Sequence, residues 1–466
     1  MSKSLLSLLI VAVAAIGLYA APAQASRNQL VMFEAPAELK DPATRDAAFA
    51  RLDALGVNSL RVVMYWRDVS PGPNDRNQPD FDTTDPAAGY NWTQFDPIFE
   101  AAEQRKWPVL LTVSGPVPKW ATRSRNDNLT RPDPNKFAQF MTAVGRKYGD
   151  RVAYWSIWNE PNHPAFLKPQ YVNKKPVSPD LYRDLFDGAL KGLKSAKVDK
   201  PQVLFGETAP TGTSKDVAPL TFLRQALCLS ESYKKLSSKC AKLPIAGYAH
   251  HAYTPKAGPN FKATGPNNVF IGVLDRLTTA LDRAARAGAI SPNRPVFLTE
   301  FGIQSEPDKI QGVPLQQQAE YRSISERIAY DNKRVKTFSQ YLLKDDQPRQ
   351  PPASMYGGFE TGLMTAAGKE KPSYDGFRLA LAATRRSSRS ASVWGLVRPA
   401  RAAGSATLEY RNGASGAFKK LRTVSYNRLG FFRVTATYSK GRQYRLTWTN
   451  ADGKVLRGSP TRAYDF

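Results

Sequence analysis

Two glutamates of this chain each follow directly on an apolar run. Glu160 is the third residue of the sequence Trp-Asn-Glu-Pro, and Glu300 is the second residue of Thr-Glu-Phe-Gly. Hydrolysis of a glycosidic bond requires two carboxyl groups, because one protonates the leaving oxygen while the other attacks the anomeric carbon or activates water. These glutamates can supply both groups if the fold brings the ends of the two runs together.

The elements that must position them are eight short apolar runs, of the kind found in strands buried on both faces. Most are followed by a stretch with helical spacing, which is the alternation of a parallel sheet covered by helices. Eight such units predict an α/β fold, a closed (β/α)8 TIM barrel. The predicted strands are residues 29–33, 59–64, 109–113, 152–158, 203–206, 245–250, 296–299 and 335–343. The predicted helices are residues 46–55, 95–105, 136–148, 179–195, 268–287, 315–331 and 374–383.

In a barrel of this type, active sites lie at the C-terminal ends of the strands. Glu160 ends the fourth predicted strand and Glu300 the seventh, and the 140 residues between them accommodate three βα units. Asn-Glu-Pro after strand 4 and Thr-Glu-Phe-Gly after strand 7 resemble glycoside hydrolase clan A, the superfamily of family 5 cellulases and family 39 β-xylosidases. The resemblance covers about residues 28–383. It implies a retaining enzyme in which Glu160 is the acid/base, protonated at rest, and Glu300 is the ionised nucleophile.

The same resemblance implies roles for four further residues. Arg61, in the second predicted strand, would hydrogen-bond the nucleophile and keep it ionised. Asn159 would contact the sugar 2-hydroxyl. In the His-Ala-Tyr sequence after strand 6, His251 would line the pocket and Tyr253 would orient the nucleophile.

One position departs from the pattern of the clan. Many members carry a tryptophan at the end of strand 8 as a floor for the sugar, whereas this chain has Gln340 and Tyr341 there. Tyr341 is a candidate to stack on the sugar in its place. Trp120, in the loop after strand 3, is a second candidate sugar platform, although large aromatic side chains more commonly pack in the core.

Metal or cofactor chemistry is not expected. The chain has three histidines, and none stands at the spacing of a metal-ligand motif. His250 is predicted to face away from the pocket, because alternate residues of a strand point to opposite sides. The expected partner of the site is therefore a carbohydrate substrate.

The chain divides into segments of different composition. Residues 1–25 have the features of a secretory signal peptide, with a basic start, an apolar run and an Ala-Gln-Ala sequence ending at Ala25. They predict cleavage after Ala25, secretion and no transmembrane anchor. Residues 26–385 form the predicted catalytic barrel and residues 386–401 a basic linker. Residues 402–466 alternate aromatic and polar residues between glycines, which predicts a small β-sandwich-like domain.

Two other features bear on the environment of the protein. The formal net charge is +26, and residues 385–466 alone carry 17 Lys/Arg against 3 Asp/Glu. This surplus is typical either of adhesion to anionic cell-wall polymers or acidic glycans, or of a solvated surface. No nucleic-acid motif accompanies it. In a secreted protein, Cys228 and Cys240 are expected to form a structural disulfide.

Two functions remain open on this reading. The first is a retaining hydrolase of β-glycosidic bonds. The second is a barrel that binds glycan without turnover, with the C-terminal domain serving in adhesion to a cell wall.

Overall fold

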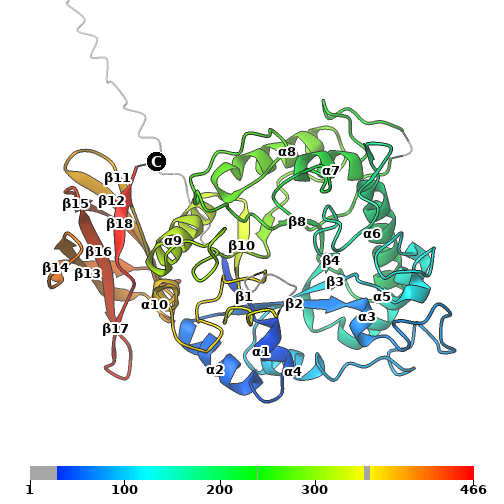
Figure 1. The fold of residues 1–466 in the computed structure, drawn as a ribbon, viewed down its shortest axis with the longest axis horizontal. Helices are drawn as coiled ribbons and strands as arrows, with labels where there is room; N and C mark the ends of the chain where they lie inside the picture. Colours follow the sequence, from blue (N-terminus) through cyan, green and yellow to red (C-terminus); the bar gives the residue numbers. More distant parts are fainter. Residues whose placement is uncertain (1–28, 239, 351–356, 466) are drawn as a thin grey trace, which may run out of the picture.

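The computed structural model describes residues 29–238, 240–350 and 357–465. Its centre is a closed barrel of eight parallel strands, in the order β1-β10-β9-β8-β7-β4-β3-β2 (Figure 1). The strands are β1 (Leu30–Glu34), β2 (Ser59–Tyr65), β3 (Val109–Ser114), β4 (Val152–Ile157), β7 (Val203–Thr208), β8 (Gly247–His250), β9 (Val296–Leu298) and β10 (Val335–Tyr341). Each coincides with one of the eight predicted runs, so the predicted TIM barrel is confirmed.

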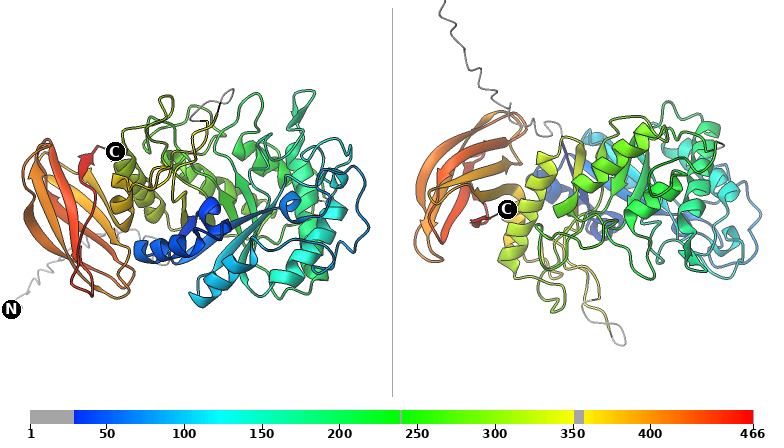
Figure 2. Two further views of the ribbon diagram at one scale, coloured as in Figure 1. Left: turned by 60° about the horizontal axis from the view of Figure 1, so that its bottom comes forward. Right: turned by 90° about the horizontal axis from the view of Figure 1, so that it is seen from above.

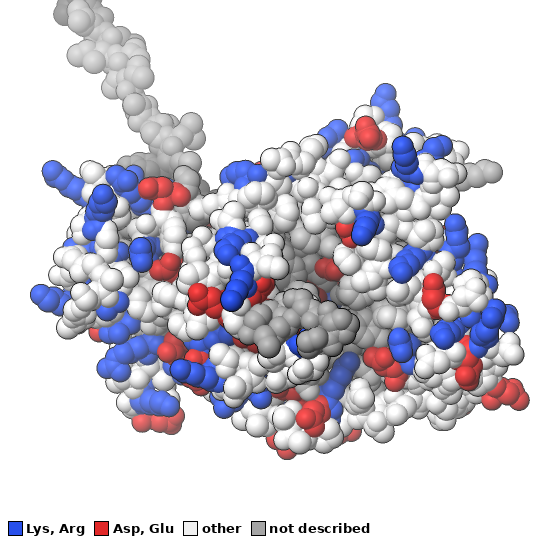
Figure 3. Space-filling view, in the orientation of Figure 1, with Lys and Arg blue, Asp and Glu red and all other residues white. Residues whose placement is uncertain are grey.

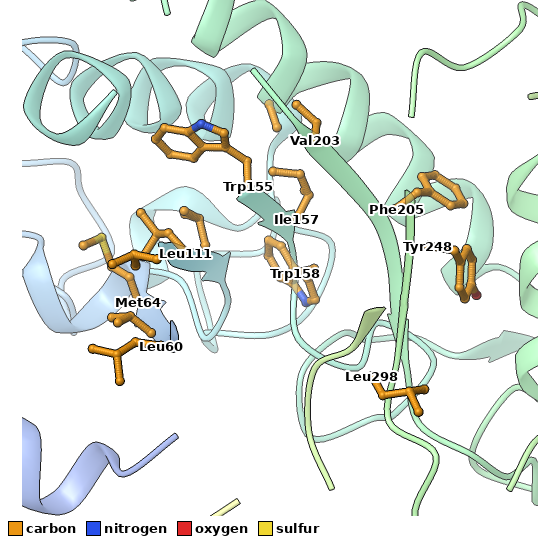
Figure 4. Packing of buried hydrophobic residues seen from close by; sticks show 14 of the residues in the cluster. Leu60, Met64, Leu111, Trp155, Ile157, Trp158, Val203, Phe205, Tyr248 and Leu298 are labelled. Carbon is orange, nitrogen blue, oxygen red and sulfur yellow. The ribbon is translucent and has the colours of Figure 1, made fainter. Parts of the chain in front are cut away.

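The barrel strands bury both of their faces, which is why they read as continuous apolar runs. Met32, Leu110, Leu204, Ala249 and Phe297 form a cluster of their own, separate from the main core of the barrel. They come from strands all around the barrel, as expected for a layer that fills its interior. Side chains such as those labelled in Figure 4 belong instead to the larger core that joins strands to helices.

Helices surround the barrel and alternate with its strands along the chain (Figures 1 and 2). They are α1 (Pro36–Lys40), α2 (Arg45–Leu55), α3 (Trp66–Val69), α4 (Asp96–Gln104), α5 (Pro134–Tyr148), α6 (Ser178–Ser195), α7 (Pro219–Ala226), α8 (Asp275–Arg286), α9 (Leu315–Asp331) and α10 (Pro372–Arg378). Local chemistry explains where some begin: the Asp133 carboxylate accepts from two amides of the first turn of α5, and Pro134 follows it. A two-stranded hairpin, β5 (Tyr171–Val172) and β6 (Lys175–Pro176), lies within the connection between β4 and α6.

The C-terminal domain is a single β structure, drawn from orange to red in Figure 1. Its main sheet has the order β14-β13-β16-β18-β11-β12-β15, and β17 pairs with β16. The strands are β11 (Leu379–Arg385), β12 (Ser390–Val397), β13 (Gly404–Asn412), β14 (Lys419–Tyr426), β15 (Phe431–Thr437), β16 (Arg442–Thr449), β17 (Val455–Arg457) and β18 (Thr461–Tyr464). The predicted small all-β domain is confirmed, and the sheet curls until it is nearly closed.

The predicted linker is wrong, however. Residues 386–401 contain β12, which pairs with β11 on one side and with β15 on the other. The Ser/Arg-rich sequence marks the hairpin turn between β11 and β12, and the apolar residues that follow it, including Trp394, are buried. The β structure therefore begins at Leu379, inside the segment predicted to extend the last helix to residue 383.

The C-terminal domain docks on α9 and α10 through a buried charged cluster. Glu326 of α9 accepts from Arg322 Nη1 and from Arg398 Nη2, both at 2.6 Å, and Arg398 follows directly on β12. The two guanidinium groups lie 4.3 and 3.9 Å from the ring centroid of Phe377. The two domains therefore share one buried network rather than a flexible connection.

Two further observations concern the environment of the protein. Cys228 and Cys240 form the expected disulfide, which closes a loop after α7. Within the described residues, no helix combines the length and apolar character needed to cross a membrane. The predicted signal peptide, residues 1–25, lies outside the described residues.

Candidate active site

The C-terminal ends of the barrel strands bring together a group of charged side chains. Glu34 ends β1, Arg61 lies within β2, Glu207 is the next-to-last residue of β7, and Glu300 comes two residues after β9. All four are buried. Figure 3 shows that the face above them is hollowed near its centre, while Lys and Arg are spread over the rim and the C-terminal domain.

Glu160 and Glu300 face one another across this end of the barrel. Glu160 lies three residues after β4, where the backbone turns sharply, with φ of 70° at Trp158 and 40° at Glu160. Such left-handed conformations are costly for non-glycine residues and cluster at functional sites. The turn is held by hydrogen bonds, including one from the Glu160 amide to the Glu207 carbonyl at 3.0 Å. One oxygen of Glu160 and one of Glu300 lie within 4.8 Å of each other.

Arg61 binds Glu300, as the sequence predicts, but it also binds three other side chains. Nη1 donates to Glu300 Oε2 at 2.9 Å, and Nη2 donates to Asn159 Oδ1 at 2.7 Å. Nε donates to Glu207 Oε1 at 3.1 Å, and Nη1 also contacts Glu34 Oε2. A single fully buried guanidinium therefore holds three carboxylates and fixes the amide of Asn159.

Glu34 and Glu207 were not among the predicted site residues. Both follow directly on predicted strands, so the signal that led to Glu160 and Glu300 was present for them as well. Neither stands in a recognisable sequence motif. In the structure, both contact the site through Arg61. Thr112 of β3 contributes a second hydrogen bond to Glu207, at 3.0 Å.

The surroundings of Glu300 favour its ionised form. Burial alone would raise the pKa of this carboxyl, but the charges of His251 and Arg61 outweigh burial and hold the pKa below its ordinary value. The Tyr253 hydroxyl donates to Glu300 Oε1 at 2.7 Å, which adds to the effect. Both oxygens of Glu300 thus accept from fixed donors, an environment suited to a carboxylate nucleophile.

His251 lies between the two glutamates rather than on an open wall of the pocket. Its Nδ1 is 2.9 Å from Glu160 Oε1 and 3.7 Å from Glu300 Oε2, and the ring is fully buried. Burial lowers its pKa, but the neighbouring Glu300 and Glu160 carboxyls outweigh burial and raise the pKa above the ordinary value. His251 therefore lies within hydrogen-bonding distance of the Glu160 carboxyl and near the Glu300 carboxylate.

The other predicted residues have different environments. Tyr341 ends β10 close to the site, with its ring edge-on to that of Phe359 at 5.2 Å. His250 points away from the pocket, as expected, and bonds Thr208 and the Val269 carbonyl. Trp120 is only 1% exposed, and its ring packs against Trp66, so it offers no face to a sugar. The platform interpretation of Trp120 is wrong because the loops after β2 and β3 cover it.

One group within the described residues has the spacing of a metal site. Glu160, His251 and Glu300 each offer a ligand atom within 4.8 Å of the others. The same spacing serves two catalytic carboxyls with a histidine between them. A cation bound here would need the carboxylate of Glu300 as a ligand. The positively charged guanidinium of Arg61 lies 2.9 Å from Glu300 Oε2 and would repel such a cation.

The buried carboxyl of Glu34 is expected to make the stability of the protein depend on pH. Burial raises its pKa from 4.5 to about 7, even though Arg61 opposes the shift. The unfolded chain then releases this proton at lower pH than the folded protein, so stability declines as pH rises from about 4.5 to 7. We expect Glu34→Gln to raise the free energy of unfolding above pH 7 by roughly 2–3 kcal/mol relative to the unaltered protein. The difference should vanish below pH 4, as measured by denaturant titrations.

The exposed Glu100→Gln, on α4, is the matched control and should leave the pH dependence unchanged. Glu300 does not confuse the comparison, because its lowered pKa places its contribution at lower pH. A Glu34→Gln variant whose stability runs parallel to that of the unaltered protein from pH 4 to 8 would show that Glu34 carries no extra proton.

Two solved structures that are similar to this chain are glycoside hydrolases. A family 39 glycoside hydrolase from the gut symbiont Bacteroides cellulosilyticus WH2 matches with a TM-score of 0.50 and 15% identity, over 91% of this chain and 81% of that one. A monomeric β-xylosidase from Caulobacter crescentus CB15 matches with a TM-score of 0.50 and 14% identity, over 89% and 94%. At this identity the likeness establishes the fold alone, a (β/α)8 barrel. No family model and no curated protein matches the sequence.

Proposed function

We propose that this chain is a retaining glycoside hydrolase that cleaves β-glycosidic bonds, with Glu300 as nucleophile and Glu160 as acid/base. The observation that carries the proposal is the pair of carboxyls on β4 and β9, with oxygens within 4.8 Å of each other. Retaining enzymes hold their carboxyls ~5–5.5 Å apart, whereas inverting enzymes need a wider gap to admit a water molecule. The donors on Glu300 support its role as the nucleophile, since they favour its ionised form.

The reaction proceeds in two displacements. Glu300 attacks the anomeric carbon while a proton held by the Glu160–His251 pair passes to the leaving oxygen, which gives a glycosyl-enzyme ester and a free alcohol. Glu160 then takes a proton from water, whose oxygen attacks the same carbon and releases Glu300. Asn159, fixed by Arg61, donates its amide hydrogen to the sugar 2-hydroxyl. Both the binding and the chemistry use side chains of this chain alone.

Secretion is part of the same proposal. It is supported by the features of residues 1–25 and by the Cys228–Cys240 disulfide, since disulfides persist in oxidising compartments. A polymeric glycan outside the cell is then the natural class of substrate. The basic surface of the C-terminal domain is suited to contact with anionic wall polymers or acidic glycans.

The experiment is hydrolysis of a panel of 4-nitrophenyl β-glycosides and polysaccharides by the purified protein. Proton NMR then identifies which anomer of the product sugar appears first. We expect turnover of at least one β-glycoside with release of the β-anomer. Release of the α-anomer would contradict the retaining mechanism. Binding of a polysaccharide without any turnover would favour the alternative, a catalytically inactive glycan-binding barrel.

A further inference from the structure

A cavity of about 400 Å³ lies next to Tyr253, the tyrosine whose hydroxyl donates to Glu300. Its wall also includes Gly302, two residues further along the chain than Glu300. Thr254 follows Tyr253 after β8, and the remaining lining comes from the segments after β9 and β10. No lining residue comes from the segment after β4, where Glu160 lies. The volume lies within the range of roughly 300–1,000 Å³ that is typical of ligand pockets.

The rim of this cavity exposes apolar surface that the protein leaves uncovered. The described chain has five large apolar residues that are at least 40% exposed, and two of them, Phe359 and Ile310, line this cavity. The Phe359 ring is 41% exposed and lies 6.4 Å from the ring of Tyr253 and 5.2 Å from that of Tyr341. Phe359 therefore adds an exposed ring to the aromatic side chains Tyr253 and Tyr341. Exposed apolar surface of this kind is typical of binding sites.

Phe359 is held in a rigid position. Its amide donates to Asp346 Oδ2 at 2.9 Å, and its carbonyl accepts from the Asp346 amide at 3.0 Å. Gly358 allows this close pairing, because a Cβ at that position would lie 2.5 Å from Asp346 Oδ2. The next residue, Glu360, is fixed through Gln304. A ring on so well anchored a backbone is preorganised, so little entropy is lost when a ligand covers it.

The polar groups of the cavity complete the chemistry of a sugar site. Gln311 places a side-chain amide on the wall. Gln304 and Asp308 also line the cavity, where they pair with each other, since Gln304 Nε2 donates to Asp308 Oδ2 at 3.1 Å. A pyranose ring presents a face of C–H bonds that packs on an aromatic ring, and hydroxyls at its edge that pair with amides and carboxylates.

We propose that this cavity is a second sugar subsite, in which Phe359 stacks on the glycone residue next to the one that Glu300 attacks. The inference rests on the proposed function. The glycone side follows from the position of the cavity next to Tyr253, which contacts the nucleophile, because Glu160 must face the leaving group. The enzyme is then selective for substrates with at least two sugar residues on the glycone side of the cleaved bond.

The test compares 4-nitrophenyl glycosides that carry one or two sugars: β-xyloside with β-xylobioside, and β-glucoside with β-cellobioside. We expect the unaltered protein to favour the disaccharide form in kcat/KM. Phe359→Ala should lower the ratio of disaccharide to monosaccharide kcat/KM by about 10- to 50-fold. Phe359→Tyr, which keeps the ring, should restore most of the ratio. Leu236→Ala, an exposed apolar residue outside the cavity, is the control and should leave the ratio unchanged.

Failure of the subsite differs from failure of the proposed function. A Phe359→Ala variant that loses activity equally on both forms, or a protein that prefers the monosaccharide form, overturns the subsite and leaves the glycosidase intact. Absence of turnover on every glycoside contradicts the proposed function, and calorimetric titration with xylotetraose and cellotetraose then tests the cavity alone. Weaker tetrasaccharide binding by Phe359→Ala than by Phe359→Tyr supports the subsite; equal binding, or none, overturns it.

Discussion

Glu300→Ala is expected to lower kcat/KM for an aryl β-glycoside about 10⁴-fold, because it removes the atom that forms the covalent intermediate. The loss should appear in kcat, since binding of the sugar relies on the surrounding side chains. The fold should survive, because the variant removes one of three carboxylates that share Arg61. Steady-state kinetics with thermal unfolding as the check on folding measures both.

Azide distinguishes the nucleophile from the acid/base. In Glu300→Ala, azide can enter the space left by the side chain, attack the anomeric carbon from the vacated side and release an α-glycosyl azide. In Glu160→Ala the glycosyl-enzyme still forms with a good leaving group, and azide attacks it from the opposite side to give a β-glycosyl azide. The two products therefore assign the two residues independently of the size of the rate loss.

Conservative variants sharpen the comparison. Glu300→Gln keeps the volume of the side chain and the hydrogen bond from Arg61, but it has no negative charge, so it should be nearly as inactive as Glu300→Ala. Glu370→Gln, an exposed glutamate on the loop before α10, is the control and should retain full activity. Activity in Glu300→Ala within 10-fold of the unaltered protein would exclude Glu300 as nucleophile.

The barrel could be predicted from the sequence because its strands are buried on both faces. Each of these strands appears in the sequence as a short apolar run. Glu160 and Glu300 could be found because they stand at strand ends within short motifs. Once the strand order is right, parallel strands leave their C-terminal ends at one rim, so the two glutamates must meet.

The sequence did not predict how many groups share one arginine. Arg61 was expected to bind Glu300, but its contacts with Glu34 and Glu207 depend on how β1 and β7 pair within the barrel. The prediction that Trp120 is a sugar platform was wrong for a related reason. Its loop position suggested exposure, yet Phe81, from a distant part of the chain, packs on it. Long-range packing of this kind leaves no mark on local sequence.

The prediction of a linker over residues 386–401 was wrong because it was based on amino-acid composition alone. Serine and arginine residues before Ser390 are typical of flexible segments, but here they form the turn of a hairpin. The strand that follows has apolar residues on both faces, because one face meets the β domain and the other meets α9. A segment that is buried between two domains has no polar face by which to recognise it.

The C-terminal domain is expected to be an integral part of the fold, and Glu326 is the residue that tests this. Glu326→Ala should lower the free energy of unfolding by about 3–5 kcal/mol, because it leaves Arg322 and Arg398 buried without a counter-charge. Burial already lowers the pKa of Arg398 to about 9, although Glu326 opposes the shift. Denaturant unfolding followed by tryptophan fluorescence measures the loss, since Trp394 lies at this interface.

Two further variants test whether the loss of stability in Glu326→Ala comes from the buried network rather than from removing any ion pair. Glu370→Ala removes an ion pair with Arg51 whose side chains are 44% and 51% exposed, and it should cost less than about 1 kcal/mol. Replacing the whole network with Arg322→Met, Glu326→Leu and Arg398→Met should recover much of the stability, because no buried charge is then left unpaired. If Glu326→Ala instead unfolds like Glu370→Ala, the buried charged network contributes little, and the domain is held by its other contacts with α9. The barrel and the β domain would then be separable, and the adhesion role of the basic domain could be tested on that domain by itself.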